Sequence, residues 1–98
     1  NMYQYILNSK AQEEYETSVN FYSEKGEEIA IKFVETTEKT IILIRKKPYL
    51  YKKSYKNFHE AVIKNFPFSI IYSVEEQIKT VIIFSVFHNN RNPKKKYK

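Results

Sequence analysis

The sequence contains no cysteine and only two histidines, His59 and His88. Without cysteine, neither a disulfide framework nor a thiolate metal site can form, and nothing indicates secretion. Two histidines are too few for a zinc site, so we predict neither a metal nor another cofactor. The longest apolar run, residues 81–87, is too short to cross a bilayer, which predicts a cytoplasmic protein with no membrane partner.

The chain is short and rich in aromatic residues. At 98 residues it can bury roughly 60–65% of its unfolded surface, which is enough for one core. We therefore expect a single domain over residues 1–98, with a short basic tail from about residue 90. Nine tyrosines and seven phenylalanines indicate that this core is assembled from a few large side chains.

The net charge of +6 is unevenly distributed along the chain. Residues 1–45 carry eight acidic and five basic side chains, whereas residues 46–98 carry three acidic and twelve basic ones. Such a basic half favours a phosphate-bearing or acidic partner, because lysine and arginine contacts release counterions and steer association. Composition alone leaves open the alternative of a solvated, lysine-rich surface.

The first half of the chain predicts one strand and two helices. Residues 2–8 are aromatic-rich and partly alternating, as in a strand. Ser9 is the expected N-cap of the first helix, with Gln12 completing a capping box, and Gly26 ends that helix in the left-handed conformation. The apolar face of the first helix comprises Ala11, Tyr15, Ser18, Val19 and Tyr22. The second helix extends to about Arg45 and presents Ile29, Phe33, Thr37, Ile41 and Ile44.

The second half of the chain predicts a sheet. Pro48 ends the helical segment, and residues 49–56 form a loop leading into a strand. Three strands follow at 57–64, 66–75 and 80–89, and their short links favour an antiparallel meander. In the last strand Val81, Ile83, Ser85 and Phe87 alternate with Ile82, Phe84, Val86 and His88, and both sets are largely apolar, as in a central strand.

These elements together predict an α+β fold. A two-helix hairpin packs on one face of an antiparallel sheet, which is formed by the N-terminal strand and the three-stranded C-terminal meander. Five short motifs in the second half of the chain restrict the choice of protein family. In order along the chain they are Asn57-Phe58-His59, Phe66-Pro67-Phe68, Ile70-Ile71-Tyr72, Val86-Phe87-His88 and Arg91-Asn92-Pro93. This ordered set resembles the RelE/ParE toxin superfamily, the toxins of type II toxin–antitoxin systems, and the resemblance covers nearly the whole chain.

The resemblance implies two alternative activities and one partner. RelE-like members cut messenger RNA on the ribosome, whereas ParE-like members inhibit DNA gyrase without nuclease chemistry. The RelE-like activity is the first expectation and the ParE-like activity is its alternative. A cognate acidic antitoxin that wraps the basic domain is expected in both cases; without it, the exposed apolar surface allows a weak homodimer.

RNA cleavage without a metal needs an acid or base, cations beside the phosphate and a proton donor. His88 is the candidate acid or base, Arg91 the phosphate clamp, and Tyr97 the residue that stacks on a base or donates a proton. Structural roles compete with each assignment, because His88 ends a strand and Arg91 can tie the tail to the sheet. Tyr72, another residue able to stack on a base, is expected in the core because its strand neighbours are apolar.

The residues expected to contact nucleic acid are basic and lie in the second half: Lys52, Lys53, His59, Lys64, Lys94, Lys95 and Lys96. The lysines also suit a solvated surface. His59 either faces the same groove as His88, forming an acid and base pair, or faces the helices as a core polar group. The nuclease hypothesis requires His88, Arg91, Tyr97 and a loop lysine to converge on one concave surface.

Overall fold

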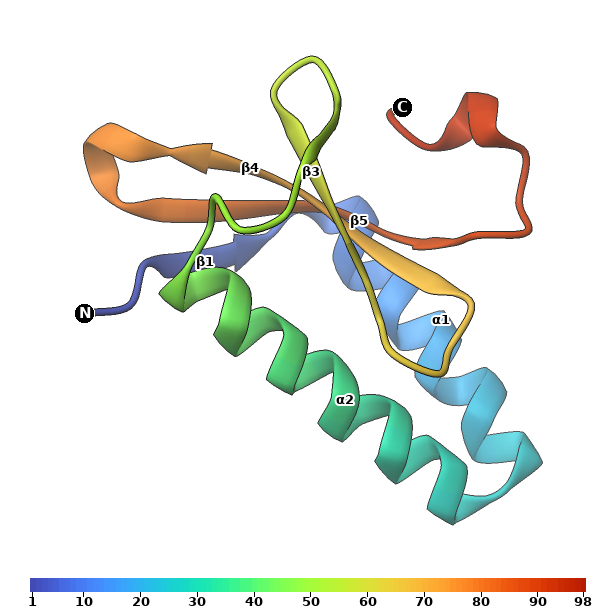
Figure 1. The fold of residues 1–98 in the computed structure, drawn as a ribbon. Coiled ribbons are helices and arrows are strands. Elements are labelled where there is room, and N and C mark those ends of the chain that lie inside the picture. Colours follow the sequence, from blue (N-terminus) through green and yellow to red (C-terminus); the bar gives the residue numbers. More distant parts are fainter.

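A computed structural model describes residues 1–98 as two helices packed on one face of a five-stranded sheet (Figure 1). The elements are β1 (Gln4–Leu7), α1 (Ser9–Lys25), α2 (Glu27–Lys46), β2 (Lys53–Tyr55), β3 (Phe58–Val62), β4 (Phe68–Glu75) and β5 (Thr80–His88). Short 3-10 turns follow β4 and β5, at Glu76–Ile78 and Pro93–Lys95. The predicted α+β class and helical hairpin are confirmed.

The sheet is mixed rather than wholly antiparallel. Its strand order is β1-β5-β4-β3-β2, and β1 runs parallel to β5 while the other pairs are antiparallel. Local hydrophobic patterns locate strands but do not reveal partners so distant in sequence, which is why the parallel pair was not predicted. β5 is a central strand, as expected, and β2 is a short exposed strand at the far edge.

The start of α1 differs from the prediction by one residue. Asn8, not Ser9, is the N-cap, and its side chain accepts the N–H of Ala11 at 2.9 Å. Asparagine and serine are comparable N-caps, so the sequence could not separate them. The predicted capping box is absent because the Gln12 amide donates to Glu16 instead.

The two helices meet at Gly26, whose φ of 159° and ψ of 148° differ from the predicted left-handed conformation. The buried face of α2 begins at Ala30 rather than Ile29, which is 41% exposed. The remaining predicted face is correct, since Phe33, Thr37 and Ile44 are buried. Neither helix combines the length and the hydrophobicity that crossing a bilayer requires.

The core between the helices and the sheet is aromatic. Tyr22 of α1, Phe33 of α2 and the pair Phe66 and Phe68 before and within β4 have ring centroids 4.9–5.3 Å apart in four of their contacts. Tilted and edge-on pairs of this kind stabilise a core beyond simple burial. The few large side chains predicted from composition therefore fix the helical hairpin to the sheet.

A β-bulge in β5 interrupts the side-chain alternation predicted for this strand. Ile71 pairs with Ser85 and Tyr72 with Ile83, which leaves Phe84 without a partner in β4. Because of this extra residue, each later side chain of β5 points to the face of the sheet opposite to the one that a regular strand would give it. Val86 consequently joins the helix-covered core, whereas Phe87 is buried on the other side, called here the outer face of the sheet.

Candidate functional site

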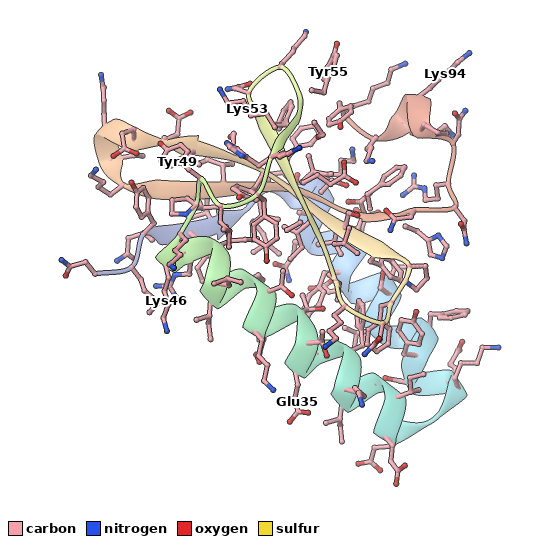
Figure 2. All side chains as sticks on the ribbon, in the orientation of Figure 1. Glu35, Lys46, Tyr49, Lys53, Tyr55 and Lys94 are labelled. Atoms are coloured by element: carbon pink, nitrogen blue, oxygen red, sulfur yellow. The ribbon has the colours of Figure 1, made fainter.

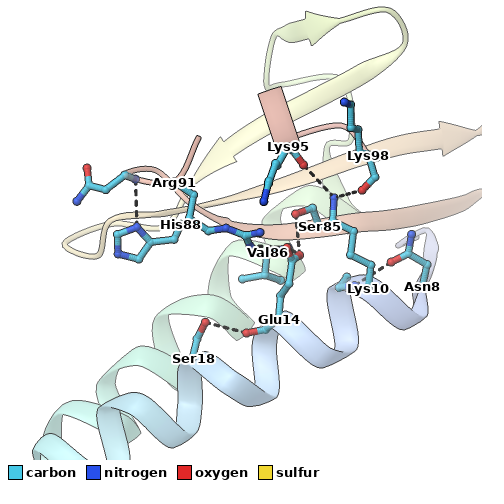
Figure 3. Close-up of polar contacts among 12 residues, drawn as sticks. Asn8, Lys10, Glu14, Ser18, Ser85, Val86, His88, Arg91, Lys95 and Lys98 are labelled. Carbon is cyan, nitrogen blue, oxygen red and sulfur yellow. Dashed lines mark hydrogen bonds and ion pairs between the residues drawn. The ribbon is translucent and has the colours of Figure 1, made fainter. Parts of the chain in front are cut away.

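The edge of β5 is open beyond residue 83. β1 pairs only with residues 80–83, so the second half of β5 has no strand on that side. Glu14 of α1 fills the position: one carboxylate oxygen accepts the N–H of Val86 at 3.0 Å and the hydroxyl of Ser85 at 2.7 Å (Figure 3). The other oxygen accepts from the guanidinium of Arg91 at 3.1 Å. A side chain thus takes the place of a neighbouring strand.

An open groove of about 940 Å³ lies beside this edge, between α1 and the end of β5. His88 lines the groove, with its ring edge-on to Phe68 at a centroid distance of 4.8 Å. Its Nδ1 accepts the backbone N–H of Asn90 at 3.1 Å, so the proton of the neutral ring lies on Nε2. His88 therefore contacts the helix-covered side of the sheet.

Lys10 connects α1 to the C-terminal tail. Its ammonium donates to the backbone carbonyls of Lys95 and Lys98 and lies 4.6 Å from the centroid of the Phe84 ring (Figure 3). Partial burial lowers the pKa of Lys10 below its ordinary value and Arg91 lowers it further, while Glu14 opposes the shift. The residue holds the tail against the outer face.

The tail is docked rather than extended into solvent. The ring of Tyr97 stacks on Phe58 at a centroid distance of 5.6 Å, and its hydroxyl shares a hydrogen bond of 2.7 Å with Ser54. Lys96 forms an ion pair of 2.7 Å with Glu60 of β3, and both side chains are about four-fifths buried. Charge and composition had predicted a tail; only these contacts, made across the chain, hold it on the sheet.

The three candidate catalytic residues are not brought together. His88 packs against Phe68 on the helix-covered side, and Arg91 lies at the edge, bound to Glu14. Tyr97 lies on the outer face, against Phe58. The sheet separates His88 from Tyr97, so the converging surface that the nuclease hypothesis requires is not formed.

The predicted lysines divide into two groups. Lys53 and Lys94 lie toward the same end of the molecule, far from Glu35 on α2 (Figure 2). Lys52 and Lys95, their neighbours in sequence, are exposed as well. Lys64 is separate, because it lies in the β3–β4 turn at the opposite end of β3.

His59 is a core polar group. Its side chain is 4% exposed, and its Nδ1 bonds the backbone carbonyl of Tyr51 at 2.7 Å. The ring stacks on Tyr72, with centroids 5.0 Å apart. Of the two orientations that the sequence allowed, His59 faces the helices, so it is not placed to contact nucleic acid.

Tyr72 is buried as predicted. Its hydroxyl donates to the carbonyl of Pro48 at 2.6 Å, and burial raises the pKa of this phenol. The bond ties the centre of β4 to the segment that follows α2.

A second polar cluster surrounds the β4–β5 hairpin. Glu76 accepts hydrogen bonds from Lys79, Tyr49 and Tyr3. These bonds, in that order of importance, lower the pKa of Glu76 to about 2. The same carboxylate raises the pKa of Tyr49 to about 12. The cluster anchors the hairpin to the N-terminal strand and to the loop after α2.

Sequence reasoning missed Glu14 and Lys10 as site residues. The hydrogen-bond partner of Glu14, Ser85, lies 71 residues away in the sequence. No local spacing indicates such a contact. The sequence shows only an acidic residue on the first helix. That this helix lies beside an open strand edge becomes clear once the strand order is known.

Two helices on one face of a five-stranded mixed sheet agree with the RelE/ParE superfamily that the sequence motifs resemble, and a family profile identifies the class. The family profile described as "ParE toxin of type II toxin-antitoxin system, parDE" matches residues 5–93, and the chain belongs to this family. A solved structure of the "Chromosomal ParDE TA system from P. aeruginosa" has a similar fold, with a TM-score of 0.74 at 16% identity. The match covers 89% of this chain and 96% of that one. Nothing among curated proteins matches the sequence.

Proposed function

We propose that this toxin acts as a ParE-like inhibitor of DNA gyrase, by binding and without nuclease chemistry. The observation that carries the proposal is the separation of His88 from Tyr97 by the sheet. General acid–base cleavage of RNA requires such groups within hydrogen-bond reach of one phosphate. Membership of the ParE family supports the same choice over the RelE-like alternative.

The basic end of the molecule is the surface we assign to binding. Lys52, Lys53, Lys94 and Lys95 are exposed there, and the nearby Glu60 is neutralised by Lys96. A cluster of free cations of this kind attracts an acidic or phosphate-bearing surface and accelerates association. Gyrase with its bound DNA offers such a surface. Because this target is cytoplasmic, the toxin would act in the cytoplasm.

A cognate antitoxin is the second partner we propose. The resemblance to the superfamily implies an acidic antitoxin segment that wraps the toxin, and the positive second half of this chain suits it. Binding by the antitoxin at the basic end would block the surface that gyrase needs. Co-purification with the product of an adjacent short gene is the expected result.

Induced expression with two parallel readouts tests the proposed activity. We expect filamentous cells with broken DNA and intact bulk messenger RNA. The His88→Ala variant should be as toxic as the wild type, because His88 has no catalytic role in this account. Rapid messenger cleavage that disappears in His88→Ala would instead establish the RelE-like nuclease.

A further inference from the structure

The sheet has three stretches of strand edge without a neighbouring strand, and two of them are protected. β2 carries Lys53 and pairs irregularly with β3, and Lys52 and Lys56 flank it. The open part of β5 is capped by Glu14. Charged side chains and irregular pairing of this kind keep an edge from pairing with another chain. The third stretch is the outer edge of β1 (Figure 1).

β1 has none of these protective features. Residues 2–9 contain no charged residue, proline or glycine, although the whole chain has a net charge of +6. β1 pairs with β5 without a register shift. Met2, Tyr5 and Ile6 are 44%, 41% and 54% exposed. An uncharged, apolar edge of this kind is open to pairing with another strand.

The backbone groups available on this edge belong to Tyr5 and Leu7. The N–H of Gln4 points to β5, where it bonds the carbonyl of Lys79. Successive residues of a strand direct their N–H and C=O groups to opposite sides, so those of Tyr5 and Leu7 point away from β5. No strand lies on that side, and these groups have no hydrogen-bond partner within the chain.

Arg45 limits where another strand can pair. Its carbonyl accepts the N–H of Tyr3 at 2.9 Å, and its Nε donates to the carbonyl of Tyr3 at 2.8 Å. The end of α2 therefore occupies the pairing position beside Tyr3. A strand added to this edge can pair with residues 5–7 but must end before it reaches Arg45. β1 itself meets this requirement, because the chain leaves the strand at Asn8 to begin α1.

We propose that β1 pairs with β1 of a second copy of this chain, antiparallel and centred on Ile6. In this register Tyr5 of each copy lies opposite Leu7 of the other, and each such pair exchanges both backbone hydrogen bonds. The two Ile6 residues then meet at the two-fold axis as a non-hydrogen-bonded pair. Ile6 shares the outer face of the sheet with its β5 partner Ile82, so its exposed side chain is covered by the other copy.

A second copy fits this edge better than a charged partner does. Cations beside β1 are already engaged, because Arg45 is bonded to Tyr3 and Lys79 is paired with Glu76. Two-fold pairing satisfies the same backbone groups on both copies and closes the assembly as a dimer. β1 and β2 are at opposite ends of the strand order, so the dimer leaves the basic end uncovered. The inference therefore goes beyond the proposed function without competing with it.

Sedimentation velocity of the purified full-length toxin tests the proposal. The short strand gives a small interface, so we expect a reversible dimer with a dissociation constant on the order of 10–100 μM. Ile6→Lys places two like charges opposite each other and should raise that constant at least about tenfold. Val62→Lys is the matched control, because Val62 of β3 is 61% exposed, and it should leave the dimer unchanged. A toxin that stays monomeric up to about 500 μM, or a dimer that Ile6→Lys does not weaken, would overturn the proposal.

Cross-linking tests the register, since the chain has no cysteine of its own. The Cα atoms of a non-hydrogen-bonded pair are about 4.5 Å apart, within the range that a disulfide spans. Ile6→Cys should therefore form a covalent dimer under mild oxidation. Gln4→Cys is the control, because in this register the two copies of residue 4 are roughly 13 Å apart and should not cross-link. Cross-linking of Gln4→Cys as fast as Ile6→Cys would contradict pairing centred on Ile6.

Discussion

The backbone N–H of Val86 donates to the carboxylate of Glu14 at 3.0 Å, at a strand edge that has no neighbouring strand. An unpaired N–H at a strand edge costs free energy when water is excluded, and an exposed edge invites pairing with another chain. Glu14 satisfies this group and also receives the hydroxyl of Ser85 and the guanidinium of Arg91. A single helical side chain therefore completes the edge of the sheet and ties down the start of the tail.

Glu14→Ala should destabilise the fold by about 1–3 kcal/mol, because it leaves the N–H of Val86 without its partner. Glu14→Gln should cost less, since the amide oxygen still accepts one bond. Denaturant unfolding measures both. Glu13→Ala, one residue away and exposed, is the control and should change stability by no more than about 0.5 kcal/mol; equal losses at both positions would contradict the role of Glu14.

Tyr72→Phe removes one buried hydroxyl. The carbonyl of Pro48 then loses its 2.6 Å hydrogen bond, and we expect a loss of about 1–3 kcal/mol in the free energy of unfolding. Tyr5→Phe is the matched control, because its hydroxyl makes no hydrogen bond within the chain. Indistinguishable stabilities for the two variants would show that the bond to Pro48 contributes nothing.

The ion pair between Lys96 and Glu60 should contribute to docking of the tail. A double-mutant cycle with Lys96→Ala and Glu60→Ala should give a coupling energy of about 0.5–3 kcal/mol that depends only weakly on salt, because both side chains are about four-fifths buried. The same cycle with the exposed Lys95 in place of Lys96 should give none. A coupling energy of zero would contradict a stabilising ion pair at this position.

The lowered pKa of Glu76 predicts how the free energy of unfolding changes at acidic pH. Its pKa in the folded chain is about 2, below the ordinary 4.5, because Lys79, Tyr49 and Tyr3 donate to the ionised form. Its contribution is therefore fully present above pH 4.5 and is lost as the pH falls through about 2. In thermal unfolding from about pH 6 to about pH 2, Glu76→Gln should lose less stability than the wild type. Parallel curves for the two proteins would contradict the assignment.

Much of the fold was predictable because hydrophobic spacing is local. The helical faces through Tyr22 and Phe33, and the apolar strands around Ile70, followed directly from periodicity. The bulge at Phe84 was not predictable, because a strand with two apolar faces looks regular in either register. The N-cap was displaced by one residue for a similar reason, since Asn8 and Ser9 are equally good candidates.

The site was less predictable than the fold, because it depends on contacts between distant residues. The charge of the tail was visible in the sequence, but its docking depends on Glu60 and Ser54, some 40 residues earlier. His88 and Tyr97 are close in sequence, yet the chain passes around the sheet edge between them. The resemblance to RelE-like toxins suggested a shared catalytic surface, which these two positions do not form.

The most direct test of the central claim is the supercoiling activity of purified DNA gyrase with increasing amounts of this toxin. We expect wild-type toxin and the His88→Ala variant to inhibit supercoiling equally, while messenger RNA on purified ribosomes stays intact with both. Unimpaired gyrase together with messenger cleavage by the wild type alone would contradict the account.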